Sequence, residues 1–221
     1  MKVLVSGCTE TVREWHERRP DRIGALLTPH TGNDPPPEPM DWAADNACFG
    51  GLDAPAFLRF LARLVESPRK PAWVCCPDVV GDMGATLAMY DRWAPCMRSL
   101  GLPVALVLQD GAELFKWRAR LPWIYGNEIA AVFVGGSTEW KESEHAERLA
   151  RQAKDDGLLV HVGRVNTERR IQRIARWNCV DTFDGSGWSK WGEARIPLAV
   201  KWIDREMRLA RRASLFDMET A

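Results

Sequence analysis

The chain has 221 residues, of which 46% are hydrophobic, and its 30 Lys and Arg residues balance its 30 Asp and Glu residues. This composition suits one domain with a sizeable core, so we expect a single domain over residues 1–221. An electrically neutral chain also lacks the overall positive charge of a protein that holds a polyanion by bulk attraction. The charge is uneven, however, because residues 158–221 hold 12 Lys and Arg against 8 Asp and Glu, while residues 1–110 hold 11 against 14. Any nucleic-acid-binding surface is therefore expected late in the chain.

Eight short apolar runs recur along the chain, and most are apolar at consecutive positions, which is typical of strands buried on both faces of a parallel sheet. In chain order they begin at Lys2 (KVLVSG), Arg22 (RIGALL), Asp41 (DWAADN), Ala72 (AWVCC), Pro103 (PVALVL), Ala130 (AAVFV), Leu158 (LLVHV) and Cys179 (CVDTF). Helix-patterned segments separate most of them, over residues 11–19, 53–66, 83–100, 111–121, 139–156, 166–177 and 189–212.

Eight strands with helical connections predict an α/β fold, a (β/α)8 TIM barrel, with a doubly wound open sheet as the alternative. The connection between the second and third runs differs, because the segment TPHTGNDPPPEPM is rich in proline and predicts a loop. The last predicted helix carries arginines at 205, 208, 211 and 212. It is either a basic amphipathic cap or an ordinary solvated closing helix.

The six cysteines show no CxxC or paired-ligand spacing, so we expect reduced thiols and no bound metal. The amino end has too short an apolar run for a secretory signal, and no later run approaches the roughly 20 residues of a membrane span. These features predict a cytoplasmic protein with no membrane partner.

The reactive face of such a barrel lies at the carboxyl ends of its strands. Polar residues and glycines follow the third to the eighth run at this position: Asp45, Asp78, Gln109 with Asp110, Gly135 with Gly136, Gly163, and Asp184. Asp and Gly also begin turns and cap helices, so each residue alone is weak evidence. Three aspartates on one rim would repel one another, however, and such a cluster usually marks a functional site.

The sequence lacks the residues that several common enzyme chemistries require. The four histidines are scattered, and the sequence contains no GxSxG elbow, P-loop, GxGxxG or strand-end lysine, so metal hydrolysis, serine hydrolysis, nucleotide-cofactor and Schiff-base chemistry have no anchor. Carboxylate chemistry remains, with one acid as nucleophile and another as acid or base, as in glycosyl transfer without a cofactor.

The segment CVDTFDGSGWSKW holds two of the acids, Asp181 and Asp184, three positions apart. In an extended strand such residues point to opposite faces. We expect Asp184, at the end of the strand, to serve the site, and Asp181 to be a structural partner of a neighbouring arginine or helix end.

Six segments, in the same order over residues 41–187, resemble motifs of the tRNA-guanine transglycosylases (queuine tRNA-ribosyltransferases). ADNACFG resembles that family's Asp-Ser-Gly-Gly-aromatic-Gln, VCCPD its Ala-Phe-Asp-Glu-Cys, LQDG its Gln-Gln-Gly, FVGGS its Val-Gly-Gly-Leu, HVGR its Met-Gly-Val-Gly, and VDTFDG its Asp-Met-Phe-Asp-Cys. The phrases VGGSTEWK, HVGRVNTERRI and DTFDGSGW look closer to the phage-type DpdA-like proteins, which place 7-deazaguanines in DNA. A phage-encoded member would act in the host cytoplasm.

The resemblance implies a DNA guanine transglycosylase, a pentosyltransferase that exchanges guanine for a 7-deazaguanine of the preQ0 type. Asp184 would attack C1′ of the sugar and form a covalent glycosyl-enzyme, and Asp45 would pass protons to the leaving base and from the incoming one. Asp78 would accept hydrogen bonds from the N1 and amino edge of the base. The remaining base contacts would be the Gly135 and Gly136 backbone with Gln109 at O6, Asp110 near the base substituent, and Phe49 stacked on the ring.

Phosphate contacts would come from a late basic set, Arg164, Arg169, Arg170, Arg173 and Lys190, with helix-surface salt bridging as the ordinary alternative. Trp188 and Trp191 are either stacking platforms for an opened strand or core residues. The chain has no cysteine after Cys179, so it lacks the family's zinc subdomain, which weakens the case for tRNA as substrate.

Three alternatives stay open: the same exchange on tRNA, an inactive barrel that only binds bases or DNA, and a carboxylate-based glycoside or nucleoside hydrolase. A homodimer or a partner protein also remains open.

Overall fold

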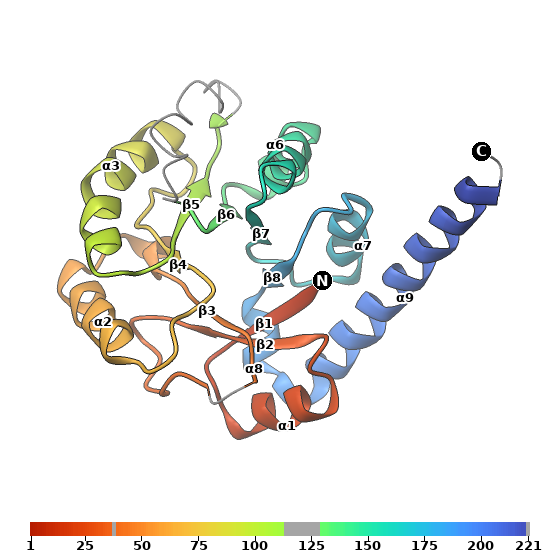
Figure 1. Ribbon diagram of the computed structural model, residues 1–221, viewed down its shortest axis with the longest axis horizontal. Coiled ribbons are helices and arrows are strands. Elements are labelled where there is room, and N and C mark those ends of the chain that lie inside the picture. The colour runs from red at the N-terminus through yellow and green to blue at the C-terminus, as the bar shows by residue number, and fades with distance from the viewer. Residues whose placement is uncertain (37–38, 113–128, 220–221) are drawn as a thin grey trace.

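In the computed structural model, which describes residues 1–36, 39–112 and 129–219, eight parallel strands close into a barrel in the order of the sequence (Figure 1). The strands are β1 (Lys2–Ser6), β2 (Ile23–Leu27), β3 (Trp42–Ala44), β4 (Val74–Cys75), β5 (Val104–Leu108), β6 (Ala131–Val134), β7 (Leu159–Val162) and β8 (Thr182–Asp184). The pairing of β1 with β8 closes the barrel. The predicted TIM barrel is therefore confirmed, and an open sheet is excluded because these strands leave no edge.

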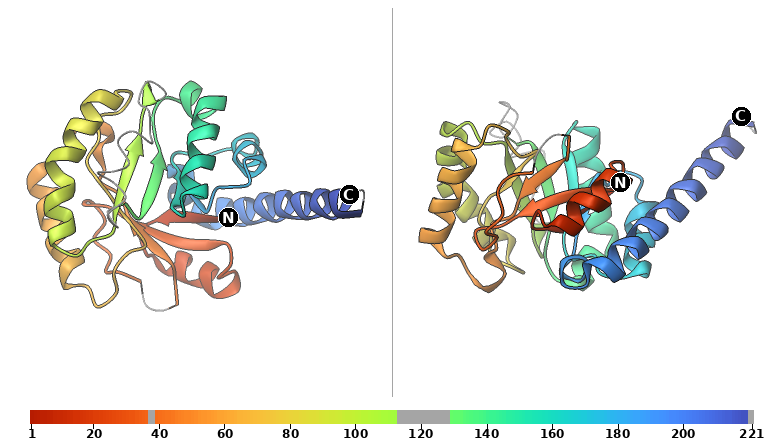
Figure 2. Two further views of the ribbon diagram at one scale, coloured as in Figure 1. Left: turned by 45° about the horizontal axis from the view of Figure 1, so that its top comes forward. Right: turned by 90° about the horizontal axis from the view of Figure 1, so that it is seen from below.

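Helices surround this barrel (Figures 1 and 2). Those in the described ranges are α1 (Glu10–Arg18), α2 (Ala54–Glu66), α3 (Met83–Ser99), α5 (Thr138–Lys141), α6 (Glu144–Asp155), α7 (Glu168–Arg176), α8 (Ser186–Lys190) and α9 (Gly192–Glu219), with a 3-10 turn at Cys48–Gly50. The proline-rich connection from β2 to β3 forms no helix over its described residues, as predicted. The helix predicted over residues 111–121 lies almost wholly outside the described residues.

Three predicted boundaries were wrong. The helix predicted over 139–156 is two helices, because the Ser143 side chain accepts a hydrogen bond from the Ala146 N–H and so caps a new start at α6. The helix predicted over 189–212 is likewise divided, at Trp191, into α8 and the long α9. The eighth strand begins at Thr182 instead of Cys179, because its ladder with β7 starts only at the pair of His161 and Thr182.

Alternation along the strands divides the apolar residues into two layers. Val3 and Val5 of β1 face outward and belong to the same core cluster as the helix residues Phe57 and Ile171. Leu4 between them faces into the barrel. The inward set is Leu4, Leu26, Ala43, Trp73, Cys75, Ala105, Val107 and Ala131, with Phe133 packed against it. The barrel interior is therefore filled with side chains.

The last helix, α9, packs along α7, α8 and α1, and its far end extends beyond the barrel (Figure 2). Asp204 fixes its middle through ion pairs with Arg19 at 2.6 Å and Arg22 at 2.8 Å. All six cysteines are free, and only Cys96 is exposed. No helix in the described ranges is long and apolar enough to cross a membrane.

Candidate active site

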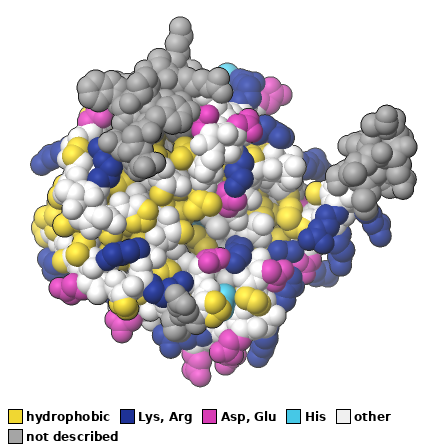
Figure 3. Space-filling view, in the orientation of Figure 1, with side chains coloured by type: hydrophobic (Ala, Val, Ile, Leu, Met, Phe, Trp, Pro, Cys, Tyr) yellow, Lys and Arg dark blue, Asp and Glu magenta, His cyan; other side chains and the backbone are white. Residues whose placement is uncertain are grey.

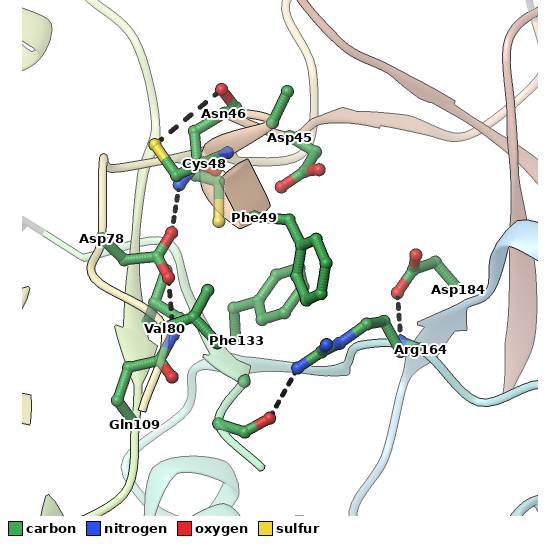
Figure 4. A pocket seen from close by; sticks show the side chains of 15 residues that line it. Asp45, Asn46, Cys48, Phe49, Asp78, Val80, Gln109, Phe133, Arg164 and Asp184 are labelled. Carbon is green, nitrogen blue, oxygen red and sulfur yellow. Dashed lines mark hydrogen bonds between the residues drawn. The ribbon is translucent and has the colours of Figure 1, made fainter. Parts of the chain in front are cut away.

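A cavity of about 110 Å³ opens at the carboxyl ends of the strands (Figure 4). It brings together most of the site residues expected from the sequence, although they come from six different strand ends. Its lining is Asp45, Asn46, Ala47, Cys48, Phe49, Cys75, Asp78, Val80, Val107, Gln109, Phe133, Gly135, Gly136, Arg164 and Asp184. Three carboxylates thus share one cavity in which, among the described residues, Arg164 alone is cationic.

Asp45 follows β3 directly and is the most perturbed of these acids. Burial, and then the neighbouring charges of Asp184 and Asp78, raise the pKa of Asp45 to about 7, against hydrogen bonds from the backbone N–H groups of Asn46 and Ala47. Ala47 has a left-handed backbone, with φ 59°, which is uncommon for a residue with a Cβ. Near neutral pH, Asp45 can therefore both donate and accept a proton.

Asp78, after β4, is held at both carboxylate oxygens. Oδ1 accepts a hydrogen bond from Asn46 Nδ2 at 2.7 Å, and Oδ2 accepts one from Gln109 Nε2 at 2.5 Å. Burial raises the pKa of Asp78, while these two bonds and the charge of Arg164 act in the opposite direction. Gln109 is itself fixed, because its Oε1 accepts the Gly81 N–H at 2.9 Å. The two side chains form a rigid polar wall with lone pairs left for a ligand.

Asp184 ends β8, and its carboxylate is oriented by two groups on one oxygen. Oδ1 accepts the backbone N–H of Arg164 at 2.9 Å and lies 3.3 Å from His161 Nε2. His161 Nδ1 lies 2.8 Å from Thr182 Oγ1. When the threonine hydroxyl donates to Nδ1, the neutral ring carries its proton on Nε2 and donates to Asp184. Oδ2 of Asp184 has no hydrogen-bond partner among the described residues, so it remains available for reaction.

Phe133 and His161 form the aromatic floor beneath this carboxylate. Their ring centres are 4.6 Å apart, and Trp73 lies 4.8 Å from the imidazole inside the barrel. His161 is fully buried. The packing fixes the orientation of the imidazole, and through it that of Asp184.

Phe49 and Arg164 lie at the mouth of the cavity. Phe49, in the 3-10 turn, is 72% exposed, and its ring centre lies 4.7 Å from the guanidinium carbon of Arg164. Arg164 Nη2 also donates to the Gly136 carbonyl at 2.7 Å. The sequence places Arg164 among the phosphate contacts, whereas the structure places its guanidinium in the cavity wall.

Gly135 and Gly136 both line the cavity, but glycine is required there by neighbouring atoms of the protein. A Cβ at Gly135 would lie 2.8 Å from Gln109 Nε2 and 2.9 Å from Val107 Cγ1. One at Gly136, where φ is +75°, would lie 2.6 Å from Asp110 Oδ2. The Gly135 N–H is already bonded to the Leu108 carbonyl at 2.9 Å. The close approach that requires glycine is therefore to the protein's own side chains.

Asp110 lies outside the cavity lining. Its carboxylate accepts hydrogen bonds from the Ser137 N–H and hydroxyl, both at 2.6 Å. Burial opposes the effect, but these bonds lower the pKa of Asp110. Asp110 therefore ties the end of β5 to the start of α5, and its expected contact with a base substituent has no support in the geometry.

The remaining basic residues of the predicted set differ in availability. The Arg169 side chain is 85% exposed and pairs with Glu142 at 3.6 Å, and Lys190 is also exposed. Arg170 is occupied by Glu142 at 3.0 Å and by Thr138 at 3.1 Å. Arg173 lines a second, smaller cavity. Further Lys and Arg side chains gather along α9 (Figure 3).

The segment after β8 is mainly structural. Trp188 is fully buried, and its Nε1 donates to the Val165 carbonyl at 2.8 Å, so it is a core residue, whereas Trp191 is 63% exposed. A Cβ at Gly185 would collide with the Asn166 side chain and would lie 2.8 Å from Trp188 Nε1. Asp181 lies away from the cavity, as its position predicts: it pairs with Lys154, at 2.6 Å, instead of an arginine.

Two side chains that hydrogen-bond to the aspartates of the cavity were missed by sequence reasoning. Asn46 links Asp78 to the 3-10 turn, because its Oδ1 accepts the Cys48 N–H at 2.8 Å. Its only signal in the sequence is its place beside Asp45. His161 was considered only as a scattered metal ligand, although its two-residue offset from Gly163 puts it on the inward face of β7. In the described part of the chain, no group of three His, Cys, Asp or Glu side chains is arranged to hold a metal ion.

The fold and the cavity define a TIM barrel with a carboxylate-lined pocket, and comparisons with known proteins add no family. No protein-family model matches the chain, and no curated protein matches it. Among solved structures, a candidate copper homeostasis protein, CutC, from Streptococcus agalactiae is similar at 14% identity and TM-score 0.49, over 83% of this chain and 98% of that one. A candidate mandelate racemase from Mesorhizobium loti is similar at 13% identity and TM-score 0.41, over 84% of this chain and 50% of that one. Similarities this distant do not bear on function.

Proposed function

We propose that the protein is a guanine transglycosylase that replaces guanine in DNA with a 7-deazaguanine of the preQ0 type. The observation that carries the proposal is the meeting of Asp45, Asp78 and Asp184 in one cavity, each in a different environment. The resemblance to tRNA-guanine transglycosylases and DpdA-like proteins marks Asp45 and Asp184 for chemistry and Asp78 for recognition of the base. The resemblance supplies the substrate class, and the geometry supplies a reason for each role.

The two reacting carboxylates have complementary environments. Asp45, with a pKa raised by burial to about 7, can hold a proton for the leaving base, while Asp184 has one oxygen oriented by donors and a second that accepts no hydrogen bond from the described residues. A pair of acids whose surroundings differ in this way is the usual arrangement for acid and nucleophile. In this scheme Asp184 Oδ2 forms a bond to C1′ as the C1′–N9 bond breaks and Asp45 protonates the departing guanine. The incoming base returns a proton from N9 to Asp45 as its nitrogen displaces the carboxylate.

Base recognition is assigned to the polar wall opposite. Asp78 can accept from the N1–H and amino group of guanine, a donor pair that adenine lacks. Gln109 keeps one N–H of its amide for O6, because the other is used by Asp78. Phe49 offers a flat surface at the mouth, where a base that has left the stack would enter.

The test is to incubate the protein with guanine-labelled DNA and, separately, labelled tRNA, with and without candidate 7-deazaguanines. Denaturing gels detect a covalent enzyme–polymer adduct, and mass spectrometry of the digested nucleosides detects inserted base. We expect guanine release, an adduct and insertion in DNA, all lost in Asp184→Ala and retained in the matched control Asp181→Asn.

Other outcomes distinguish the alternatives. Insertion into tRNA but not DNA would favour the tRNA reaction, and release without insertion would favour a hydrolase. Binding without release in either polymer would indicate an inactive barrel. An active Asp184→Ala variant would overturn the assignment of the nucleophile.

A further inference from the structure

The Gly163–Arg164 peptide lies between a buried lysine and the carboxylate proposed as nucleophile. Its carbonyl oxygen accepts a hydrogen bond from Lys141 Nζ at 3.0 Å, and its N–H donates to Asp184 Oδ1 at 2.9 Å. Lys141, at the end of α5, is only 6% exposed. It lines a separate cavity of about 20 Å³ on the other side of this peptide, and it does not line the main cavity.

We propose that Lys141 is a positioning residue that orients Asp184 and stabilises its negative charge through the polarised Gly163–Arg164 peptide. An ammonium group that binds a carbonyl oxygen draws electrons from the amide and makes its N–H a stronger donor, because hydrogen bonds in a chain reinforce one another. Lys141 thus acts on the carboxylate without occupying space that a substrate needs. The consequence for catalysis rests on the proposed function, but the link between the two charges does not.

The backbone conformation at this peptide allows the Arg164 N–H to reach Asp184. Arg164 has φ 59°, in the left-handed region that a side chain normally disfavours, and strain of this kind persists where the surrounding structure requires it. A Cβ at Gly163 would lie 2.5 Å from Phe133 Cε1 and 3.5 Å from Asp184 Oδ1. Glycine therefore lets the peptide pass between the aromatic floor and the carboxylate.

The groups around Lys141 lower its pKa but leave its ammonium group charged near neutral pH. Burial, and then the positive charge of Arg164, lower the pKa of Lys141 to about 8, and Arg170 acts in the same direction. The negative charges of Asp184 and Glu142 oppose them. Near neutral pH the ammonium form still predominates, so the link is present when the proposed reaction would run.

The first test measures the link without any need for activity. Urea unfolding midpoints at pH 7 are compared for the wild type, Lys141→Met, Asp184→Asn and the double variant. We expect Lys141→Met to lower the midpoint more in the wild-type background than in the Asp184→Asn background, because the two charges stabilise each other. Lys154→Met, which removes a lysine paired with Asp181 just before the start of β8, is expected to add independently to Asp184→Asn. Additive effects of Lys141→Met and Asp184→Asn would overturn the proposal.

The second test measures the catalytic consequence in a single turnover. Lys141→Met should slow formation of the covalent adduct roughly tenfold or more, the equivalent of one charge-assisted hydrogen bond, with polymer affinity unchanged. Lys141→Arg, which keeps the charge and the donor, should restore much of the rate, and Lys154→Met should leave it unaltered. An unslowed Lys141→Met variant would refute the role in catalysis. If the wild type forms no adduct, the proposed function fails, while the unfolding experiment still decides whether the two charges are linked.

Discussion

The guanidinium of Arg164 and the ring of Phe49 lie in a cation–π contact, 4.7 Å from the guanidinium carbon to the ring centre, across the mouth of the carboxylate cavity. Arg164 is fixed from behind by its bond to the Gly136 carbonyl, whereas Phe49 is largely exposed. Arg164 therefore covers part of the ring, and the large exposed fraction of Phe49 leaves surface on which a flat ligand can stack.

Replacement of Phe49 should affect binding much more than folding. Phe49→Ala removes a stacking surface worth about 1–3 kcal/mol per base, so the affinity for guanine should fall roughly tenfold. The unfolding free energy should change by less than about 1 kcal/mol, because the side chain is exposed. Titration calorimetry with guanine and urea unfolding measure the two effects. Leu58→Ala, at an exposed apolar position of α2, is the control, and equal affinities of wild type and Phe49→Ala would exclude stacking by this ring.

The charge on Asp45 should make stability depend on pH in a defined direction. The pKa of Asp45 is raised from 3.8 to about 7, so between these values the folded state binds more protons than the unfolded state, and stability falls as pH rises. Above pH 7 the full cost of the buried charge is present. Asp45→Asn should therefore stabilise the protein at pH 8, on the order of 1–3 kcal/mol, and have little effect near pH 4.

Urea unfolding of wild type and Asp45→Asn at several pH values checks this prediction, with the exposed acid Glu144, changed to Gln, as control. If the difference in unfolding free energy between wild type and Asp45→Asn did not vary with pH, the pKa of Asp45 would not be raised in the folded protein. In the same variant base exchange should be lost, because an amide cannot pass the proton.

The fold and the residues of the cavity were largely predictable, for a common reason. A strand buried on both faces must be apolar at consecutive positions, and the first polar residue after it must lie on the rim. Asp45, Asp78 and Asp184 stand at such positions, so strand ends alone brought them together. The hydrogen-bond partners of these aspartates were harder to predict. The direction of a side chain depends on local turns, such as those at the left-handed residues Ala47 and Arg164. No pattern in the sequence distinguishes these two positions from ordinary loop residues.

The structural role of Asp181 was predictable from the strand face on which its position lies. Its carboxylate accepts the Val160 N–H at 2.9 Å and pairs with Lys154, both outside the cavity. Asp181→Asn should therefore cost about 1–2 kcal/mol of unfolding free energy and leave guanine exchange close to the wild-type rate. Thermal or urea unfolding together with an exchange assay tests both parts. A variant that is stable but inactive would show that Asp181 takes part in chemistry.

Gly136 should tolerate no side chain, for two reasons that can be separated. Alanine there would be strained at φ +75°, and its Cβ would also lie 2.6 Å from Asp110 Oδ2 and 2.9 Å from Trp140 Cε3. Gly157, after α6, has φ +81°, and a Cβ added there would meet nothing within 4 Å, so Gly157→Ala reports the backbone strain alone. We expect Gly157→Ala to cost about 1 kcal/mol and Gly136→Ala to cost about 1–3 kcal/mol more, since the end of β6 must shift to relieve the crowding. Because that shift would move the carbonyl that holds Arg164, ligand affinity should fall in Gly136→Ala only. Equal losses of stability in the two variants would mean that the contact between Gly136 and Asp110 relaxes without cost.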